Sequence, residues 1–202
     1  MPLNTTGRNK LLDSGKAAFT HFGAFTDIGV TEVAGGSYAR QAITWAAAGS
    51  GAVATSGTLT VPIPAGTTVQ TVGDFDAVSA GNILGWAGYH STTPPKGLAT
   101  VLASSDVFTR YAHGLTTDDR VFFWAVEGGS IPTGISASTL YFVLAASLTT
   151  DSFLVSTSSG GATLNVTANG EVAYQKTVPN TFASAGNLVV NSGNHTLDAT
   201  FA

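Results

Sequence analysis

The sequence predicts an all-β fold: an antiparallel β-sandwich with a short N-terminal helix and an inserted small β-barrel or β-sandwich module. Two observations support this prediction. Short stretches of alternating or β-branched apolar residues recur about every ten residues, separated by turn residues, in a chain with 24 glycines and 7 prolines. Only 10% of the 202 residues are charged, against roughly 25% in an ordinary soluble domain, and small neutral residues take their place.

The low charge also narrows the function. A surface with few ionic groups suits a chain that packs against copies of itself or other subunits. It suits an enzyme poorly, because an enzyme must gather titratable groups at one site. The net charge is −4 and the eight Lys and Arg stand singly, so we expect no nucleic-acid partner. The chain has no cysteine, which excludes disulfides and thiolate metal sites, and no membrane-spanning apolar run is present.

One segment is predicted to be helical, residues 8–18, with Thr5 or Thr6 as its cap. Leu11 lies on its weakly apolar side, and Gly15 limits the helix to two or three turns.

The same segment is locally basic. Arg8, Lys10 and Lys16 are opposed only by Asp13. We interpret the three basic residues as a possible attachment segment for an acidic neighbour, with a solvated helix face as the alternative.

The first half of the chain then alternates strands with turns. Residues 39, 41, 43 and 45 share one face of a strand, and the prolines at 62 and 64 place a strand end at an edge or a bulge. The strands predicted here are 18–25, 38–45, 53–63, 67–75 and 82–90.

The composition changes near residues 92–97. Half of the twelve carboxylates lie between 106 and 176, and residues 121–126 and 141–144 are apolar on both faces, as in a closed barrel or a sandwich of about 70 residues. The last 25 residues return to the earlier composition, and we expect them to form a hairpin that rejoins the first sheet. This predicts two domains, 1–100 plus 177–202, and an inserted module at 101–176. The strands predicted within the module are 107–111, 120–126, 140–145, 152–156 and 172–176.

Candidate chemistry is sparse. The four histidines, His21, His90, His113 and His195, lack metal-ligand spacing and are expected at strand ends or turns. Asp74 and Asp76 share a strand face, which leaves three interpretations: a solvated edge, a Ca²⁺ turn, or the acid and base of glycoside cleavage. We predict no catalytic residue, cofactor or metal ligand, and no enzyme activity.

Aromatic residues offer one further possibility. Six of them could stack on sugars, although aromatic residues on strands usually belong to the core. Tyr89 and Tyr111 lie near predicted loops and are the candidate exposed contacts. The six are Tyr38, Trp45, Trp86, Tyr89, Tyr111 and Trp124.

Several motifs resemble those of phage proteins. The segments 11–25, 32–41 and 61–69 resemble tail fibre or minor tail proteins of tailed phages of actinobacteria, and the run Glu-Val-Ala-Gly-Gly-Ser-Tyr-Ala-Arg-Gln at 32–41 is the most specific. The inserted segment resembles a module repeated in phage structural proteins. Its marks are residues 113–115, 119–121, 131–135, 140–143 and 153–161.

The resemblance implies a non-enzymatic, multimeric, all-β virion protein. We expect a homotrimer whose sandwich attaches to other virion proteins and whose inserted module projects outward, where it could meet host cell-surface glycan. The N-terminus lacks an apolar signal core, so synthesis in the host cytoplasm is expected. Two alternatives stay open at this point: a capsid decoration (head cementing) protein on the virion exterior, and a carbohydrate-binding or depolymerase protein.

Overall fold

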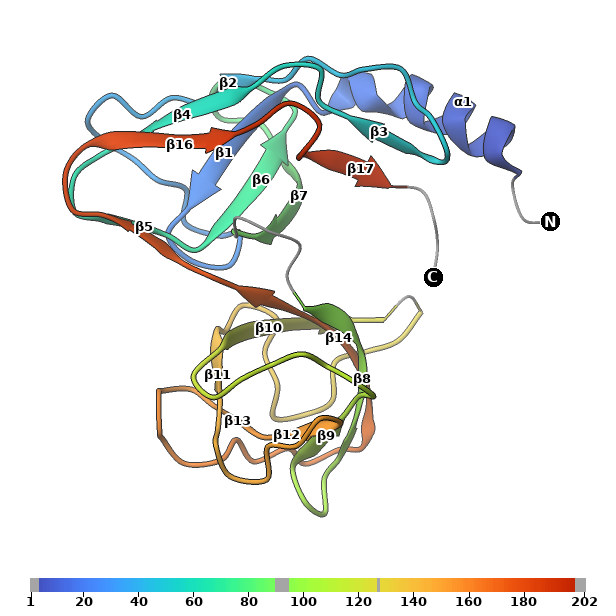
Figure 1. The fold of residues 1–202 in the computed structure, drawn as a ribbon, viewed down its shortest axis with the longest axis vertical. Helices are drawn as coiled ribbons and strands as arrows, with labels where there is room; N and C mark the ends of the chain where they lie inside the picture. The colour runs from blue at the N-terminus through green and yellow to red at the C-terminus, as the bar shows by residue number, and fades with distance from the viewer. Residues whose placement is uncertain (1–3, 90–94, 127, 199–202) are drawn as a thin grey trace. The chain divides into compact units, whose positions relative to one another are not determined.

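The structure is a computed structural model that describes residues 4–89, 95–126 and 128–198. It is mainly β with one short N-terminal helix (Figure 1), so the predicted fold class is confirmed. The paired strands run antiparallel. The elements are α1 Thr5–Gly15, η1 Lys16–Ala18, β1 His21–Phe25, β2 Gln41–Ala42, β3 Ala52–Ala54, β4 Leu59–Ile63, β5 Thr67–Val69, β6 Thr71–Phe75, β7 Ile83–Gly88, β8 Lys96–Leu102, β9 Val107–Thr109, β10 Arg120–Ala125, β11 Tyr141–Val143, β12 Ser152–Phe153, β13 Val155–Ser156, β14 Gly170–Thr177, β15 Asn180–Phe182, β16 Gly186–Val190 and β17 Thr196–Asp198.

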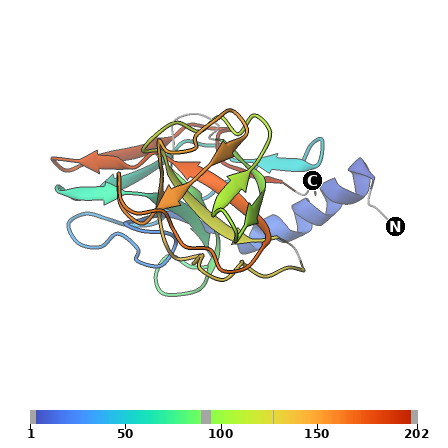
Figure 2. The same cartoon turned by 90° about the horizontal axis from the view of Figure 1, so that it is seen from below.

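The helix begins earlier than predicted, and its cap differs. Asn4 is the cap, because its Oδ1 accepts a hydrogen bond from the Gly7 backbone N–H at 2.8 Å. Thr5 is already helical, so the expectation of a Thr5 or Thr6 cap was wrong. The α-helix ends at Gly15 and continues as the 3₁₀ turn η1. α1 contacts β3 and lies beside it (Figure 1 and Figure 2).

The chain divides into two compact units, Met1–Trp86 with Thr181–Ala202, and Ala87–Asn180. In the first unit, four strands form a sheet in the order β2-β1-β6-β7. The register sets Phe22 opposite Asp74 and Gly23 opposite Gly73. Because neighbours along a strand point to opposite faces, Phe22 and Asp74 share one face of this sheet and Phe25 lies on the other.

Beside this sheet runs a long two-stranded ribbon. β5, β4 and β3 pair in turn with β15, β16 and β17, and Figure 1 shows β16 alongside β4. The buried ribbon side chains alternate along the strands, as in β4, where Leu59, Val61 and Ile63 point inward.

The C-terminal residues do not form the expected hairpin. β16 and β17 both continue along residues 52–63 and do not pair with each other. The turn between them is tied to Thr55, whose N–H donates to His195 O and whose carbonyl accepts from Gly193 N–H. These bonds keep the two chain segments side by side through the turn.

Several predicted strands are shorter or divided. Strand 53–63 becomes β3 and β4, and strand 67–75 becomes β5 and β6, which pair with different partners. Strand 38–45 is reduced to β2 and a single bridge at Trp45. Parts of the predicted segments 82–90, 92–97 and 196–201 lie outside the described residues.

The second unit is one seven-stranded sheet, ordered β12-β9-β8-β14-β10-β11-β13. Its first and last strands, β12 and β13, are separated in the chain by Leu154 alone. The sheet therefore nearly closes on itself as a small barrel. Stacked aromatic rings fill the interior, with Phe108 4.8 Å from Phe123 and 5.3 Å from Phe153 between ring centroids. The strand β8 was not predicted.

Candidate functional site

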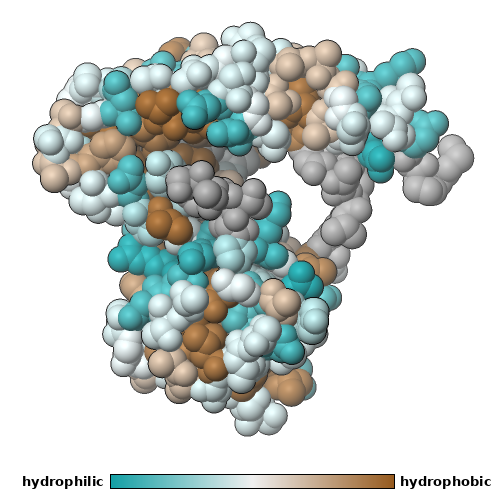
Figure 3. Space-filling model, viewed as in Figure 1, coloured by the Kyte–Doolittle hydropathy of each residue, from teal (hydrophilic) through white to brown (hydrophobic). Residues whose placement is uncertain are grey.

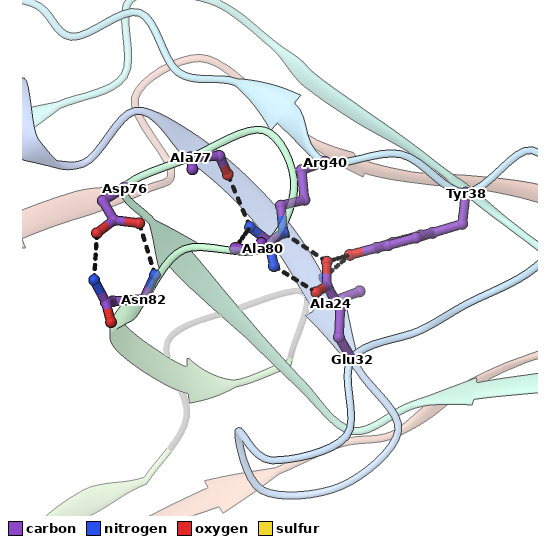
Figure 4. Close-up of polar contacts among 8 residues, drawn as sticks. All are labelled: Ala24, Glu32, Tyr38, Arg40, Asp76, Ala77, Ala80 and Asn82. Carbon is purple, nitrogen blue, oxygen red and sulfur yellow. Dashed lines mark hydrogen bonds and ion pairs between the residues drawn. The ribbon is translucent and has the colours of Figure 1, made fainter.

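A connected polar cluster of the first unit is centred on the run 32–41 (Figure 4). Arg40 forms a two-pronged ion pair with Glu32, with Nε–Oε1 at 2.8 Å and Nη2–Oε2 at 2.7 Å. Its Nη1 donates to the carbonyls of Ala77 at 2.8 Å and Ala80 at 2.6 Å. The Tyr38 hydroxyl donates to Glu32 Oε1 at 2.7 Å. We call Glu32, Tyr38, Arg40 and these two carbonyls the Arg40 clasp.

The clasp joins three parts of the first unit. The Ala24 N–H of β1 donates to the Tyr38 hydroxyl at 3.1 Å, and the Arg40 guanidinium lies 3.5 Å from the centroid of the Phe75 ring. The clasp therefore covers the sheet face that carries Phe25 and Phe75, whose rings stack at 5.5 Å. The turn after β6 is bound by the same arginine.

The electrostatics of the clasp favour its charged form. Burial alone would raise the pKa of Glu32, but hydrogen bonds from Arg40 and Tyr38 outweigh it and hold that pKa below its ordinary value. The pKa of Arg40 is raised, chiefly by its hydrogen bond to Glu32. Burial raises the pKa of the Tyr38 phenol, and the bond to Glu32 adds to this.

The local geometry explains why glycine occupies three positions near the clasp. A Cβ on Gly23 would lie 2.6 Å from the Tyr38 hydroxyl, so only glycine admits that ring. Gly35 and Gly36 have φ of +87° and +56°, the left-handed region that glycine adopts without strain. The run 32–41 thus encodes a turn and an internal ion pair. From the sequence, this run was predicted to carry the start of strand 38–45 and to mark the resemblance to phage proteins; the ion pair between Glu32 and Arg40 was not predicted.

The two candidate carboxylates have separate internal partners. Asp74 is only 4% exposed, and its Oδ1 lies 2.8 Å from His195 Nε2. Asp76 follows the end of β6 and accepts two hydrogen bonds from Asn82, both at 2.7 Å. Because Asp74 is buried, the interpretation of a solvated edge was wrong for this residue.

The histidines are internal or outside the described residues. His195 lies edge-on to Phe22 at 5.0 Å. His113 is buried; its Nδ1 accepts from the Leu115 N–H, which leaves Nε2 as the donor to Ser152 O. His21 Nδ1 lies 2.9 Å from Thr20 Oγ1, and His90 is not described. Among the described residues, no group of three or more His, Cys, Asp and Glu could hold a metal ion.

The predicted attachment residues differ in their surroundings. Lys16 forms a 2.6 Å ion pair with Asp13 and donates to Ala46 O. Arg8 is half-buried beside Thr5, and Lys10 is exposed. Polar contacts from one side of α1, including Asn9 Oδ1 to the Gly51 N–H at 2.8 Å, hold the helix against the loop before β3. The role of these residues in attachment stays a prediction.

The aromatic candidates differ in their exposure to solvent. Tyr111 is 80% exposed, whereas Tyr89 is half-buried. Trp45 is held by a hydrogen bond to Phe19 O at 2.8 Å, and the Trp86 ring lies against the backbone of Gly29. Trp124, on β10, is 37% exposed, and sequence reasoning did not choose it.

Taken together, the described residues form a mainly β fold in which the Arg40 clasp and the Asp74–His195 pair bind groups of the same chain. No helix among the described residues is long and apolar enough to cross a membrane. The family model described as podophage GP4 fiber I protein gp80 matches residues 17–117, half of the 202 residues. The chain belongs to this family of phage fibre proteins, and the predicted resemblance to phage tail fibre proteins is confirmed to that extent. No curated protein matches the chain. No solved structure matches it either.

The family match covers the Arg40 clasp and the strands from β1 to β9. It assigns the chain a virion structural role of the tail-fibre type. The assignment to phages of actinobacteria stays a prediction.

Proposed function

We propose that this chain is a fibre subunit that associates with copies of itself, as a homotrimer, through neutral β-surfaces. The family match over residues 17–117 is the observation that carries the proposal. The first unit is the side that attaches to other virion proteins, and the second unit projects outward toward the host surface.

The distribution of charge supports self-association. No Asp, Glu, Lys or Arg occurs in 41–73 or in 177–197, which together supply almost the whole ribbon. Exposed strand edges in soluble proteins are normally protected by charges, and this ribbon has none before Asp198. Figure 3 shows pale residues of intermediate hydropathy and apolar patches over much of the visible face. Val189 of β16 is one exposed apolar residue of the ribbon.

The purified full chain tests this proposal by size-exclusion chromatography with light scattering. We expect a trimer that also binds virions lacking the protein. A stable monomer that shows no affinity for such virions would overturn the proposal. Counting copies per particle by quantitative gel separates a fibre, which needs few copies, from a capsid decoration protein, which needs hundreds.

A further inference from the structure

An apolar strip crosses the outer face of the barrel on three adjacent strands. The register places Leu98 of β8 opposite Ala173 of β14, and Ala173 opposite Trp124 of β10. Their neighbours along the strands, including Ala99 and Phe123, belong to the barrel core. Side chains alternate along a strand, so Leu98, Ala173 and Trp124 all point outward. We call these three residues the Trp124 platform.

The platform is apolar where an outer face is usually polar. Trp124 is 37% exposed and Leu98 46% exposed, while Ala173 between them is only 6% exposed. Ala173 lies between two larger residues, so the accessible apolar surface of the strip is that of Leu98 and Trp124. Adjacent strands are about 4.8 Å apart, so the strip is about 10 Å long. Phe122 supports the indole from one side, with ring centroids 5.6 Å apart, and is itself buried.

Polar side chains border the strip on both sides. Two residues along each strand from the strip, and therefore on the same face, Lys96 lies opposite Gln175 on one side and Thr100 lies opposite Glu171 on the other. Lys96, Thr100 and Glu171 are exposed. Gln175 is half-buried, and its Oε1 accepts from the Gly88 N–H at 3.3 Å. The border thus contains hydrogen-bond donors and acceptors together with one charge of each sign.

This combination matches the chemistry of a sugar ring. A pyranose has an apolar C–H face that stacks on an aromatic ring, and a rim of hydroxyls that both donate and accept. A second copy of this chain fits less well. Its ribbon carries no charge before Asp198, so most of the ribbon would bury Lys96 and Glu171 without partners, which is costly.

We propose that the Trp124 platform binds a saccharide ring of a cell-surface polysaccharide. The inference rests on the proposed fibre function for its biological setting, but the binding itself does not require it. One site is expected to bind weakly, and several copies in one fibre would give avidity.

The full chain labelled with 5-fluorotryptophan tests the site directly by ¹⁹F NMR. The probes are methyl glycosides of glucose, galactose, mannose, N-acetylglucosamine and rhamnose, with glycerol as the control. We expect saturable movement of the Trp124 resonance with at least one glycoside, while those of Trp45 and Trp86 stay fixed. The proposal would be overturned if the chemical shift of Trp124 did not change with any glycoside. It would also be overturned if the shift changed on protein dilution alone, which would indicate contact between copies.

Two variants separate this proposal from the fibre function. We expect Trp124→Ala to weaken binding of the same glycoside, followed by saturation-transfer NMR, about tenfold, the scale of loss when a stacking aromatic is truncated. Tyr111→Ala, which removes another exposed aromatic, should leave binding unchanged. Both variants should stay folded at the assay temperature and enter virions normally. Equal loss in both variants, or exclusion of Trp124→Ala alone from virions, would refute the site. Failure of the unsubstituted chain to enter virions would instead count against the fibre proposal.

Discussion

Arg40 makes directed contacts with two chain segments at once. Its guanidinium binds both oxygens of Glu32 and two carbonyls of the 77–80 turn, and it covers the ring of Phe75. A planar guanidinium supplies this fork of donors, whereas a lysine ammonium is a point charge with three donors on a flexible stem. The residue type therefore follows from the geometry as well as from the charge.

We expect Arg40→Lys to lower the free energy of unfolding of the first unit by about 1–2 kcal/mol, because the partly buried Glu32 carboxylate and Ala77 carbonyl lose donors. Denaturant titration measures this loss. Arg120→Lys is the matched control, since Arg120 stacks on Phe142 at a centroid distance of 5.3 Å, and it should cost about 1 kcal/mol or less. Equal losses in the two variants would show that the fork is unimportant.

The lowered pKa of Glu32 gives the clasp a dependence on pH. The carboxylate is favoured in the folded state, so its contribution is present above the ordinary glutamate pKa of about 4.3 and is lost as the pH falls through the lower folded value. We expect the stability difference between the wild type and Glu32→Gln to narrow by on the order of 1 kcal/mol from neutral pH to about pH 3. A series of urea titrations across this range measures the difference. A gap that widens in acid would contradict the assignment.

At the scale of the elements, a strand could be predicted from the sequence where its apolar residues face the core in a regular pattern. β10 and β14 were predicted because apolar residues face the core. β8 was missed because its outward positions carry Leu98 and Leu102 while Ala99 faces the core. In a half-buried strand the large apolar residues are expected to face the core, but Leu98 and Leu102 of β8 face outward. The sequence of β8 therefore lacks the usual alternation of apolar core residues and polar surface residues. The same inversion concealed the Trp124 platform.

Long-range pairing set the other limit on prediction. Asp74 and His195 are 121 residues apart in the chain, and nothing local to either residue indicates the other. The ion pair of the clasp joins residues that are close in the chain, since Glu32 and Arg40 are eight residues apart. Predicting it would also have required predicting the turn that Gly35 and Gly36 form with positive φ.

The Asp74–His195 contact fastens the C-terminal segment to the sheet. We expect His195→Ala to leave the buried Asp74 without this partner and to raise hydrogen exchange in residues 186–198, with a loss of about 1–3 kcal/mol in local stability. Hydrogen-exchange mass spectrometry on the full chain measures this. Ser192→Ala, which removes only a 3.3 Å bond to Thr55 O, should change exchange little. Unchanged protection in His195→Ala would show that strand pairing alone holds the segment.

At the scale of the whole molecule, two cores stabilise the two units separately. Phe153 belongs to the stacked aromatic core of the barrel, and Leu188 is buried in the ribbon of the first unit. We expect Phe153→Ala to cost the second unit about 3–5 kcal/mol and Leu188→Ala to cost the first unit about 2–5 kcal/mol. Exchange measured by peptide should rise in 95–180 for the first variant and in 52–63 for the second. A uniform rise across the chain in either variant would indicate one cooperative core.

The low charge of the chain leads to a prediction about how salt affects the association of its copies. Contacts between neutral surfaces gain little from Coulomb attraction, so salt has little to screen. Salts that strengthen apolar burial should instead favour the contact. We expect the oligomer mass from light scattering to persist at about 1 M NaCl, where the screening length is about 3 Å, and ammonium sulfate to lower the concentration needed for assembly. Val189→Lys, which places a charge on the exposed ribbon position, should shift the equilibrium toward monomer, whereas Ser138→Lys on a barrel loop should not. An oligomer that dissociates in NaCl would show that the few ionic groups, and not the neutral strands, hold the copies together.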